Sequence, residues 1–140
     1  MHPIRSLLFA LTWTVVLAAC SSEGRSAEIV CHTAYRVSTS DQLTGTDTVQ
    51  ILDERSSRSI PYIYLEFHAE YTPGFDDNER ALRVWVTPSA SEQLLAVQLY
   101  QLPTEEGPVD QFVGGHGFTG LNYVYDPVSG AELQYWCEAG

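Results

Sequence analysis

Residues 62–71 of the chain read YIYLEFHAEY and show the clearest pattern in the sequence, a strict alternation of side chains. Alternate side chains of a β-strand point to opposite sides of a sheet, so the pattern predicts a strand with one buried face. The face assigned to the core carries Ile63, Leu65, Phe67, Ala69 and Tyr71. The face expected to meet solvent carries Tyr62, Tyr64, Glu66, His68 and Glu70.

A second strand is predicted at residues 81–87, with the turn-forming residues of a hairpin loop before it. If Glu70 pairs with Arg83, the apolar faces of the two strands coincide. The same register places His68 opposite Trp85. A third strand at residues 94–102 is expected to add three apolar side chains to this core, namely Leu95, Val97 and Leu99.

Further strands are predicted at residues 29–37 and 46–53, and a C-terminal hairpin is predicted to turn at residues 126–130. That turn places Tyr125 opposite Glu132. No long amphipathic helix is expected after residue 27. The sequence therefore predicts an all-β fold, an antiparallel two-sheet sandwich of about seven strands, with a small closed β-barrel as the alternative.

Charge excludes one class of partner. The 140-residue chain has seven arginines, no lysine and 18 acidic residues, all 18 of which follow Cys20. Without residues 1–19, six arginines face 18 carboxylates, a net charge of −12. Such a surface has no cationic patch with which to bind nucleic acid. It is instead suited to attract cationic partners or divalent cations.

The N-terminus has the three parts of an export signal in residues 1–19: a short basic start, an apolar run at residues 7–17 and small residues before Cys20. The apolar run is too short for an ordinary transmembrane helix. The LAAC sequence at residues 17–20 resembles the lipobox of bacterial lipoproteins. This resemblance implies a diacylglyceryl thioether on Cys20 and cleavage in front of it. The expected location is extracytoplasmic, with the acylated Cys20 anchored in the lipid bilayer of the cell membrane or outer membrane.

The resemblance also divides the chain. Residues 20–27 are small and polar, typical of a lipidated tether, and residues 28–140 are expected to form a single β domain. With Cys20 acylated, Cys31 and Cys137 remain, and an exported pair of this kind is expected to form a disulfide between the first and last strands. The rival interpretation, a thiolate metal site or a catalytic thiol, needs further ligands or a base.

The C-terminal hairpin has two possible buried faces, and the alternation of its side chains does not distinguish them. The expected disulfide does. One candidate set is Leu121, Tyr123 and Trp136, and the other is Val124, Leu133, Tyr135 and Cys137. A bridge through Cys137 favours the second set.

Aromatic residues on predicted outward faces form the candidate binding surface, which consists of Tyr62, Tyr64, Glu66, His68 and Trp85. An exposed aromatic cluster is typical of a recognition surface, although the same rings would be ordinary core if a second layer covered them. No catalytic residue, metal site or cofactor is predicted. Glu66, His68 and Glu70 do stand side by side, but alternate strand residues lie about 6–7 Å apart, which is wide for one ion.

The predicted function is a membrane-anchored, non-enzymatic binding or envelope-structural β module. One alternative is a small metal-dependent or hydrolytic enzyme, which requires Glu66, His68, Glu70 or His116 to converge in space. Another is an inhibitor of a cationic envelope-directed enzyme. Two cysteines near the ends of an anchored β domain are similar to the organisation of small envelope lipoproteins that inhibit lysozyme, but the residues with which that family engages its target are not found here.

Overall fold

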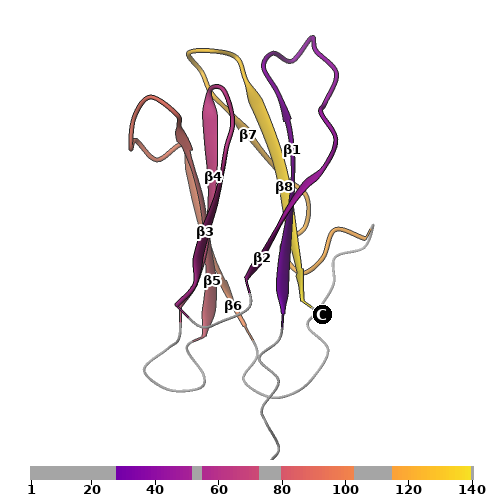
Figure 1. The fold of residues 1–140 in the computed structure, drawn as a ribbon, viewed down its shortest axis with the longest axis vertical. Helices are drawn as coiled ribbons and strands as arrows, with labels where there is room; N and C mark the ends of the chain where they lie inside the picture. The colour runs from indigo at the N-terminus through magenta and orange to yellow at the C-terminus, as the bar shows by residue number, and fades with distance from the viewer. Residues whose placement is uncertain (1–27, 52–54, 73–79, 103–114, 140) are drawn as a thin grey trace, which may run out of the picture.

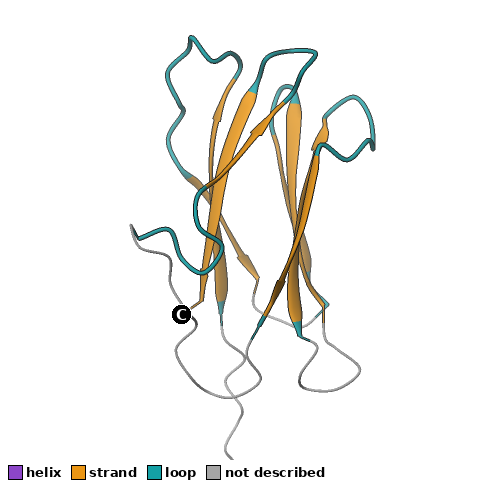
Figure 2. Ribbon diagram, turned by 180° about the vertical axis from the view of Figure 1, so that it is seen from behind, coloured by secondary structure: helices purple, strands orange, loops and turns teal. Residues whose placement is uncertain are grey.

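The computed structural model describes residues 28–51, 55–72, 80–102 and 115–139. In these ranges the regular secondary structure consists of β-strands alone. Eight strands form two antiparallel sheets that pack face to face (Figure 1). Sheet A has the order β2-β1-β8-β7, and sheet B has the order β3-β4-β5-β6. Seen from behind, the strands again form two layers that are joined by loops (Figure 2). The predicted two-sheet sandwich is confirmed, and the closed barrel is wrong. The predicted signal and tether, including Cys20, lie outside the described residues.

The strands of sheet A are β1 (Ile29–Arg36), β2 (Asp47–Ile51), β7 (Asn122–Tyr125) and β8 (Glu132–Ala139). Those of sheet B are β3 (Ser57–Pro61), β4 (Leu65–Thr72), β5 (Ala81–Pro88) and β6 (Ala96–Gln101). Strand β3 was not predicted, because its sequence SRSIP has no apolar alternation and four of its five residues are exposed at the edge of the sheet. Within the described residues, no helix is long and apolar enough to span a membrane.

The core lies between the inner faces of the two sheets. Strands β4 and β5 pair in the predicted register, with Glu70 opposite Arg83 and His68 opposite Trp85. The inner side chains of β4 and β5 are almost completely buried, and Phe67 meets Tyr135 of sheet A with ring centres 5.4 Å apart. Burying an aromatic side chain of this size contributes about 1.5–3 kcal/mol.

Strand β6 corrects one part of the predicted core. Val86 pairs with Ala96, so Val97 and Leu99 point to the outer face, where both are exposed. Leu95, which precedes the strand, does pack against the core. A shift of one residue moves every side chain of a strand to the other face, and β6 has apolar residues in both sets, so its sequence does not specify the face.

The start of β4 corrects a second part. Residues 62–64 do not continue the strand but form the turn after β3, closed by a 2.8 Å hydrogen bond from the Tyr62 N–H to the Leu65 carbonyl. Ile63, which was assigned to the core, therefore lies on this turn and is 69% exposed.

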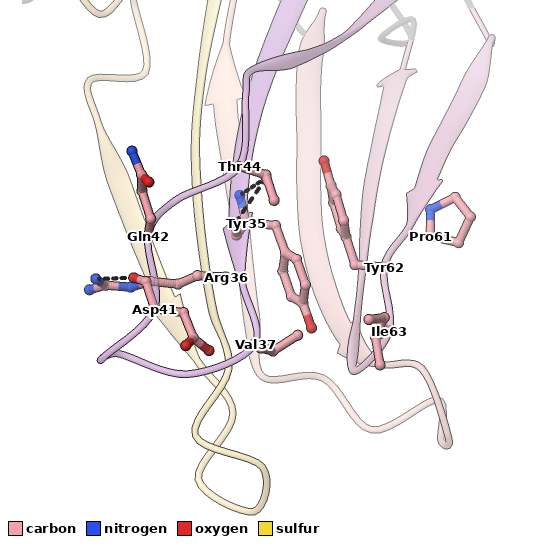
Figure 3. Close-up of a pocket in the computed structure, with 9 residues that line it drawn as sticks. All are labelled: Tyr35, Arg36, Val37, Asp41, Gln42, Thr44, Pro61, Tyr62 and Ile63. Carbon is pink, nitrogen blue, oxygen red and sulfur yellow. Dashed lines mark hydrogen bonds between the residues drawn. The ribbon is translucent and has the colours of Figure 1, made fainter.

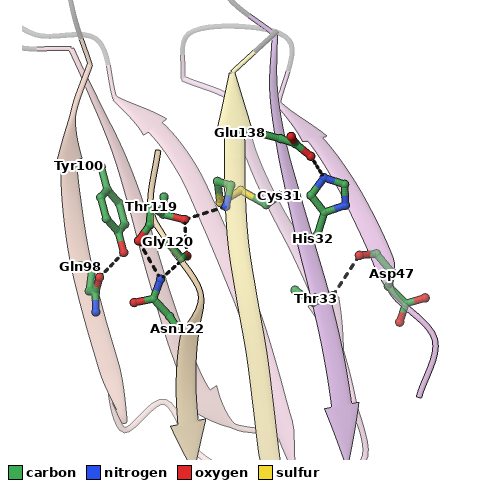
Figure 4. The surroundings of a disulfide bond; sticks show 11 residues. Cys31, His32, Thr33, Asp47, Gln98, Tyr100, Thr119, Gly120, Asn122 and Glu138 are labelled. Atoms are coloured by element: carbon green, nitrogen blue, oxygen red, sulfur yellow. Dashed lines mark hydrogen bonds and ion pairs between the residues drawn. A yellow bond between two sulfur atoms is a disulfide. The ribbon is translucent and has the colours of Figure 1, made fainter. Parts of the chain in front are cut away.

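The disulfide joins Cys31 and Cys137 as predicted. The two residues face each other on the adjacent strands β1 and β8, with Cα atoms 4.0 Å apart (Figure 4). Because these are the first and last strands of the described residues, the bridge closes almost all of the described domain. The second candidate set for the buried face of the C-terminal hairpin, which a bridge through Cys137 favours, is confirmed. Its side chains are buried, namely Val124, Leu133, Tyr135 and Cys137, whereas Tyr123 and Trp136 point outward.

The segment before β7 packs against this bridge. The Phe118 N–H donates to the Cys137 carbonyl at 3.0 Å. The Cys137 N–H donates to Thr119 Oγ1 at 2.8 Å (Figure 4). A Cβ on Gly117 would lie 2.0 Å from the Cys137 carbonyl oxygen, and its φ is +59°. Only glycine fits at this position, because any side chain would collide with the backbone of β8.

The turn between β7 and β8 has the predicted form. Gly130 adopts φ +77°, and Tyr125 pairs with Glu132. The Asp126 carboxylate accepts hydrogen bonds from the hydroxyl and N–H of Ser129 and from the Val128 N–H, which hold the pKa of Asp126 below its usual value.

Candidate binding site

Three of the five residues of the predicted surface lie together on the outer face of sheet B. Glu66 and His68 are on β4, and Trp85 is on β5 directly opposite His68. The other two, Tyr62 and Tyr64, lie in the turn between β3 and β4. Tyr64 is 45% exposed, whereas Tyr62 turns inward between the sheets, so its assignment to the outer surface is wrong.

Trp85 is the fixed centre of this group. The imidazole of His68 stacks on it with ring centres 4.9 Å apart and planes 5° from parallel. The Arg83 guanidinium carbon lies 4.6 Å from the centre of the indole ring, a cation–π contact. The structure thus shows that this indole accepts a guanidinium beside it.

His68 adds no positive charge to the site at neutral pH. Burial lowers its pKa below the usual 6.5, and the nearby Glu66 carboxylate offsets this only in part. His68 Nε2 lies 3.2 Å from Thr87 Oγ1, within hydrogen-bonding distance, whereas Nδ1 is 4.0 Å from Glu66 Oε1, too far for a hydrogen bond. The charge of Glu66 is therefore left uncompensated by its nearest neighbour.

These side chains line a hollow of about 480 Å³ that we call the sheet-B pocket. Its wall consists of Glu66, His68, Trp85, Thr87 and residues 88–92 and 94, which include Glu92. Among the described residues, neither Glu66 nor Glu92 accepts a hydrogen bond, and no arginine lines the pocket. The pocket combines an aromatic wall with two unpaired carboxylates.

The loop wall of the pocket is anchored to the neighbouring turn. The Ser89 N–H donates to the Tyr64 carbonyl, and the Ser89 hydroxyl donates to the Tyr62 carbonyl, both at 2.9 Å. The turn that carries Tyr64 therefore supports the sheet-B pocket through its backbone, although Tyr64 itself does not line it.

No family model, curated protein or solved structure matches the chain. A functional conclusion therefore rests on the side chains and their surroundings.

A second hollow, of about 560 Å³, lies at one end of the sandwich (Figure 3). It is lined by Tyr35, Arg36, Val37, Asp41, Gln42, Thr44, Pro61, Tyr62 and Ile63. The rings of Tyr35 and Tyr62 stack with centres 4.6 Å apart, and the Tyr62 hydroxyl is hydrogen-bonded to Thr33 and Asp47. Burial raises the pKa of Tyr62 well above its usual value. Tyr62 thus packs the two sheets together. Pro61, which precedes it, is the residue from which the sequence could have predicted the turn.

The residues of the enzyme alternative are divided between the two outer faces of the sandwich. Glu66 and His68 share the sheet-B pocket, with Oε1 and Nδ1 4.0 Å apart. His116 contacts Trp136 on sheet A, on the other side of the sandwich from His68. Within the described part of the chain, no three His, Cys, Asp or Glu side chains are grouped as metal ligands.

Proposed function

We propose that the chain is a lipid-anchored extracytoplasmic binding module that captures a cationic partner in the sheet-B pocket. The observation that supports it most is the pair of unpaired carboxylates, Glu66 and Glu92, beside the Trp85 ring. Carboxylates and an indole are the groups that a guanidinium or ammonium contacts best. The partner class is therefore a protein or peptide with exposed arginine or lysine.

The charge of the whole chain supports the same partner. With a net charge of −12 after residue 19, the domain has a field that attracts cations and repels anionic polymers. Such a field mainly raises the association rate, while contacts inside the pocket decide how long the partner stays.

The anchor supports the location. The lipobox at residues 17–20 implies acyl chains on Cys20, and the seven residues from Ser21 to Ala27 reach at most about 23 Å. The domain would then stay close to its membrane, where it meets cationic proteins that act on or cross the envelope. Inhibition of a cationic envelope-directed enzyme is one activity that such a module can have.

The test uses the full lipidated chain in detergent and an oligo-arginine peptide as the probe, with binding measured by calorimetry. The double variant Glu66→Gln with Glu92→Gln removes both carboxylates of the pocket. Each charged hydrogen bond is worth about 1.5 kcal/mol or more, so binding should weaken roughly tenfold per residue.

The matched control is Glu28→Gln with Asp41→Asn, which removes two exposed charges outside the pocket. This control should change the affinity by about twofold or less, since exposed charges are screened. Equal losses in the two double variants would show that net charge, and not the pocket, holds the peptide. That result would overturn the proposal.

A further inference from the structure

The outer face of sheet A carries a second group of aromatic side chains. Tyr123 and Tyr125 lie on β7 and are 53% and 51% exposed. Trp136 and Gln134 lie beside them on β8, with Gln134 directly opposite Tyr123. We call these four residues the sheet-A aromatic face. It lies on the side of the sandwich opposite to the sheet-B pocket.

The rings of this face are held in place by their surroundings. Tyr125 lies directly opposite Glu132, whose side chain is fully buried. Trp136 is stacked on His32 at 4.9 Å and meets the edge of His116 at 5.4 Å. A ligand that binds to rings already in position loses little conformational entropy on binding.

The carboxylates on this face are bonded within sheet A. Glu132 forms an ion pair with Arg36, and Glu138 is hydrogen-bonded to His32. The other groups of this face are aromatic rings and the amide of Gln134, whose nitrogen donates to Glu132 at 2.6 Å and whose oxygen can accept a hydrogen bond. In a chain with a net charge of −12, this face is suited to an uncharged ligand that offers both an apolar surface and hydroxyl groups.

We propose that the sheet-A aromatic face binds an uncharged polysaccharide. A sugar ring has a flat patch of C–H groups that packs on an aromatic ring, and its hydroxyls can bond to an amide. Tyr123 and Tyr125 are two residues apart on one strand, so their rings are spaced about 6–7 Å along β7. An extended sugar chain running along β7 would meet the two tyrosines in turn and reach Trp136 beside them.

The test incubates the full chain with particles of cellulose and chitin and titrates it with a soluble chitin oligosaccharide. The double variant Tyr123→Ala with Tyr125→Ala should lose at least tenfold in affinity. The matched control is Tyr64→Ala, which removes a tyrosine of similar exposure from the turn between β3 and β4 and should bind as the unmodified chain does. Thermal unfolding of each variant establishes that it is folded.

Two outcomes would overturn the proposal. One is that the chain binds none of these polysaccharides, or that the double variant binds as well as the control. The other is a dimer in sedimentation experiments that dissociates in the double variant, which would make the face an interface between two copies. The carboxylate variant of the sheet-B pocket should keep its polysaccharide binding, so failure at one site is distinguishable from failure at the other.

Discussion

The two outer faces of the sandwich carry the same pair of side chains, a histidine stacked on a tryptophan of the neighbouring strand. On sheet A the pair is His32 with Trp136, and on sheet B it is His68 with Trp85. The ring centres are 4.9 Å apart in both pairs, and in both the histidine lies directly opposite its tryptophan. The pair itself therefore does not distinguish the faces.

The carboxylates around each pair do distinguish them. On sheet A, Glu138 bonds to His32, and the buried Glu132 pairs with Arg36. On sheet B, the Glu66 carboxylate is 4.0 Å from His68, and the Glu70 carboxylate is 3.9 Å from Arg83, with about a third of each glutamate side chain exposed. The same stacked pair thus lies beside carboxylates that are bonded within sheet A, and beside the Glu66 carboxylate of the sheet-B pocket, which accepts no side-chain hydrogen bond from the described residues. We interpret the carboxylates of sheet A as stabilising and those of the sheet-B pocket as available for binding.

The largest expected difference between the sheets concerns the disulfide, which lies in sheet A. Replacement of Cys31 and Cys137 by alanine should lower the free energy of unfolding by on the order of 4–5 kcal/mol, because the bridge closes a loop of about a hundred residues. Urea unfolding of the double variant measures this. The oxidised protein treated with a reductant should show the same loss, and a loss below about 1 kcal/mol would contradict the role given to the bridge.

A smaller difference in the free energy of unfolding should appear when the two glutamate–arginine pairs are broken. Glu132→Ala leaves Arg36 beside an empty buried position and should cost about 3 kcal/mol or more. Glu70→Ala breaks an exposed pair with Arg83 and should cost less than about 1 kcal/mol. Chemical denaturation of the two variants compares the faces directly. Similar costs for the two would mean that the pairs are equivalent and that the contrast between the faces is wrong.

The smallest expected effect is a difference in pH dependence. Burial lowers the pKa of His68 in the folded state, so the unfolded chain binds a proton more readily and stability should fall as the pH drops below about 6.5. Burial alone would raise the pKa of Glu132, but hydrogen bonds from Gln134 and Arg36 outweigh it and lower the pKa. Its contribution is therefore present above about pH 4.5 and lost as the pH falls further.

Urea denaturation at a series of pH values measures where these two declines in stability begin. The variant His68→Gln should remove the decline that begins near pH 6.5 and keep the one at lower pH. A decline near pH 6.5 that persists unchanged in this variant would assign it to another group.

Pairing within sheet B was predictable because β4 and β5 each have one apolar and one mixed face. Matching Phe67 with Val86 leaves no choice of register, and the His68–Trp85 contact follows from it. Strand β6 was not predictable in the same way, since Leu95, Val97 and Leu99 alternate with Ala96 and Tyr100, and the chain entering from β5 decides which set turns inward. Tyr62 was misplaced because alternation was continued past the turn that follows Pro61.

The sequence by itself determined the β class, the pairing of β4 with β5, the partnership of Cys31 with Cys137 and the acidic charge, because each depends on neighbouring residues or on composition. The lipid anchor on Cys20 and its location stay predictions. Only the tertiary structure decided that Glu66 and Glu92 share a hollow and that Trp136 lies between His32 and His116. These contacts join residues that are distant along the chain, and their geometry depends on how strands and loops pack in three dimensions.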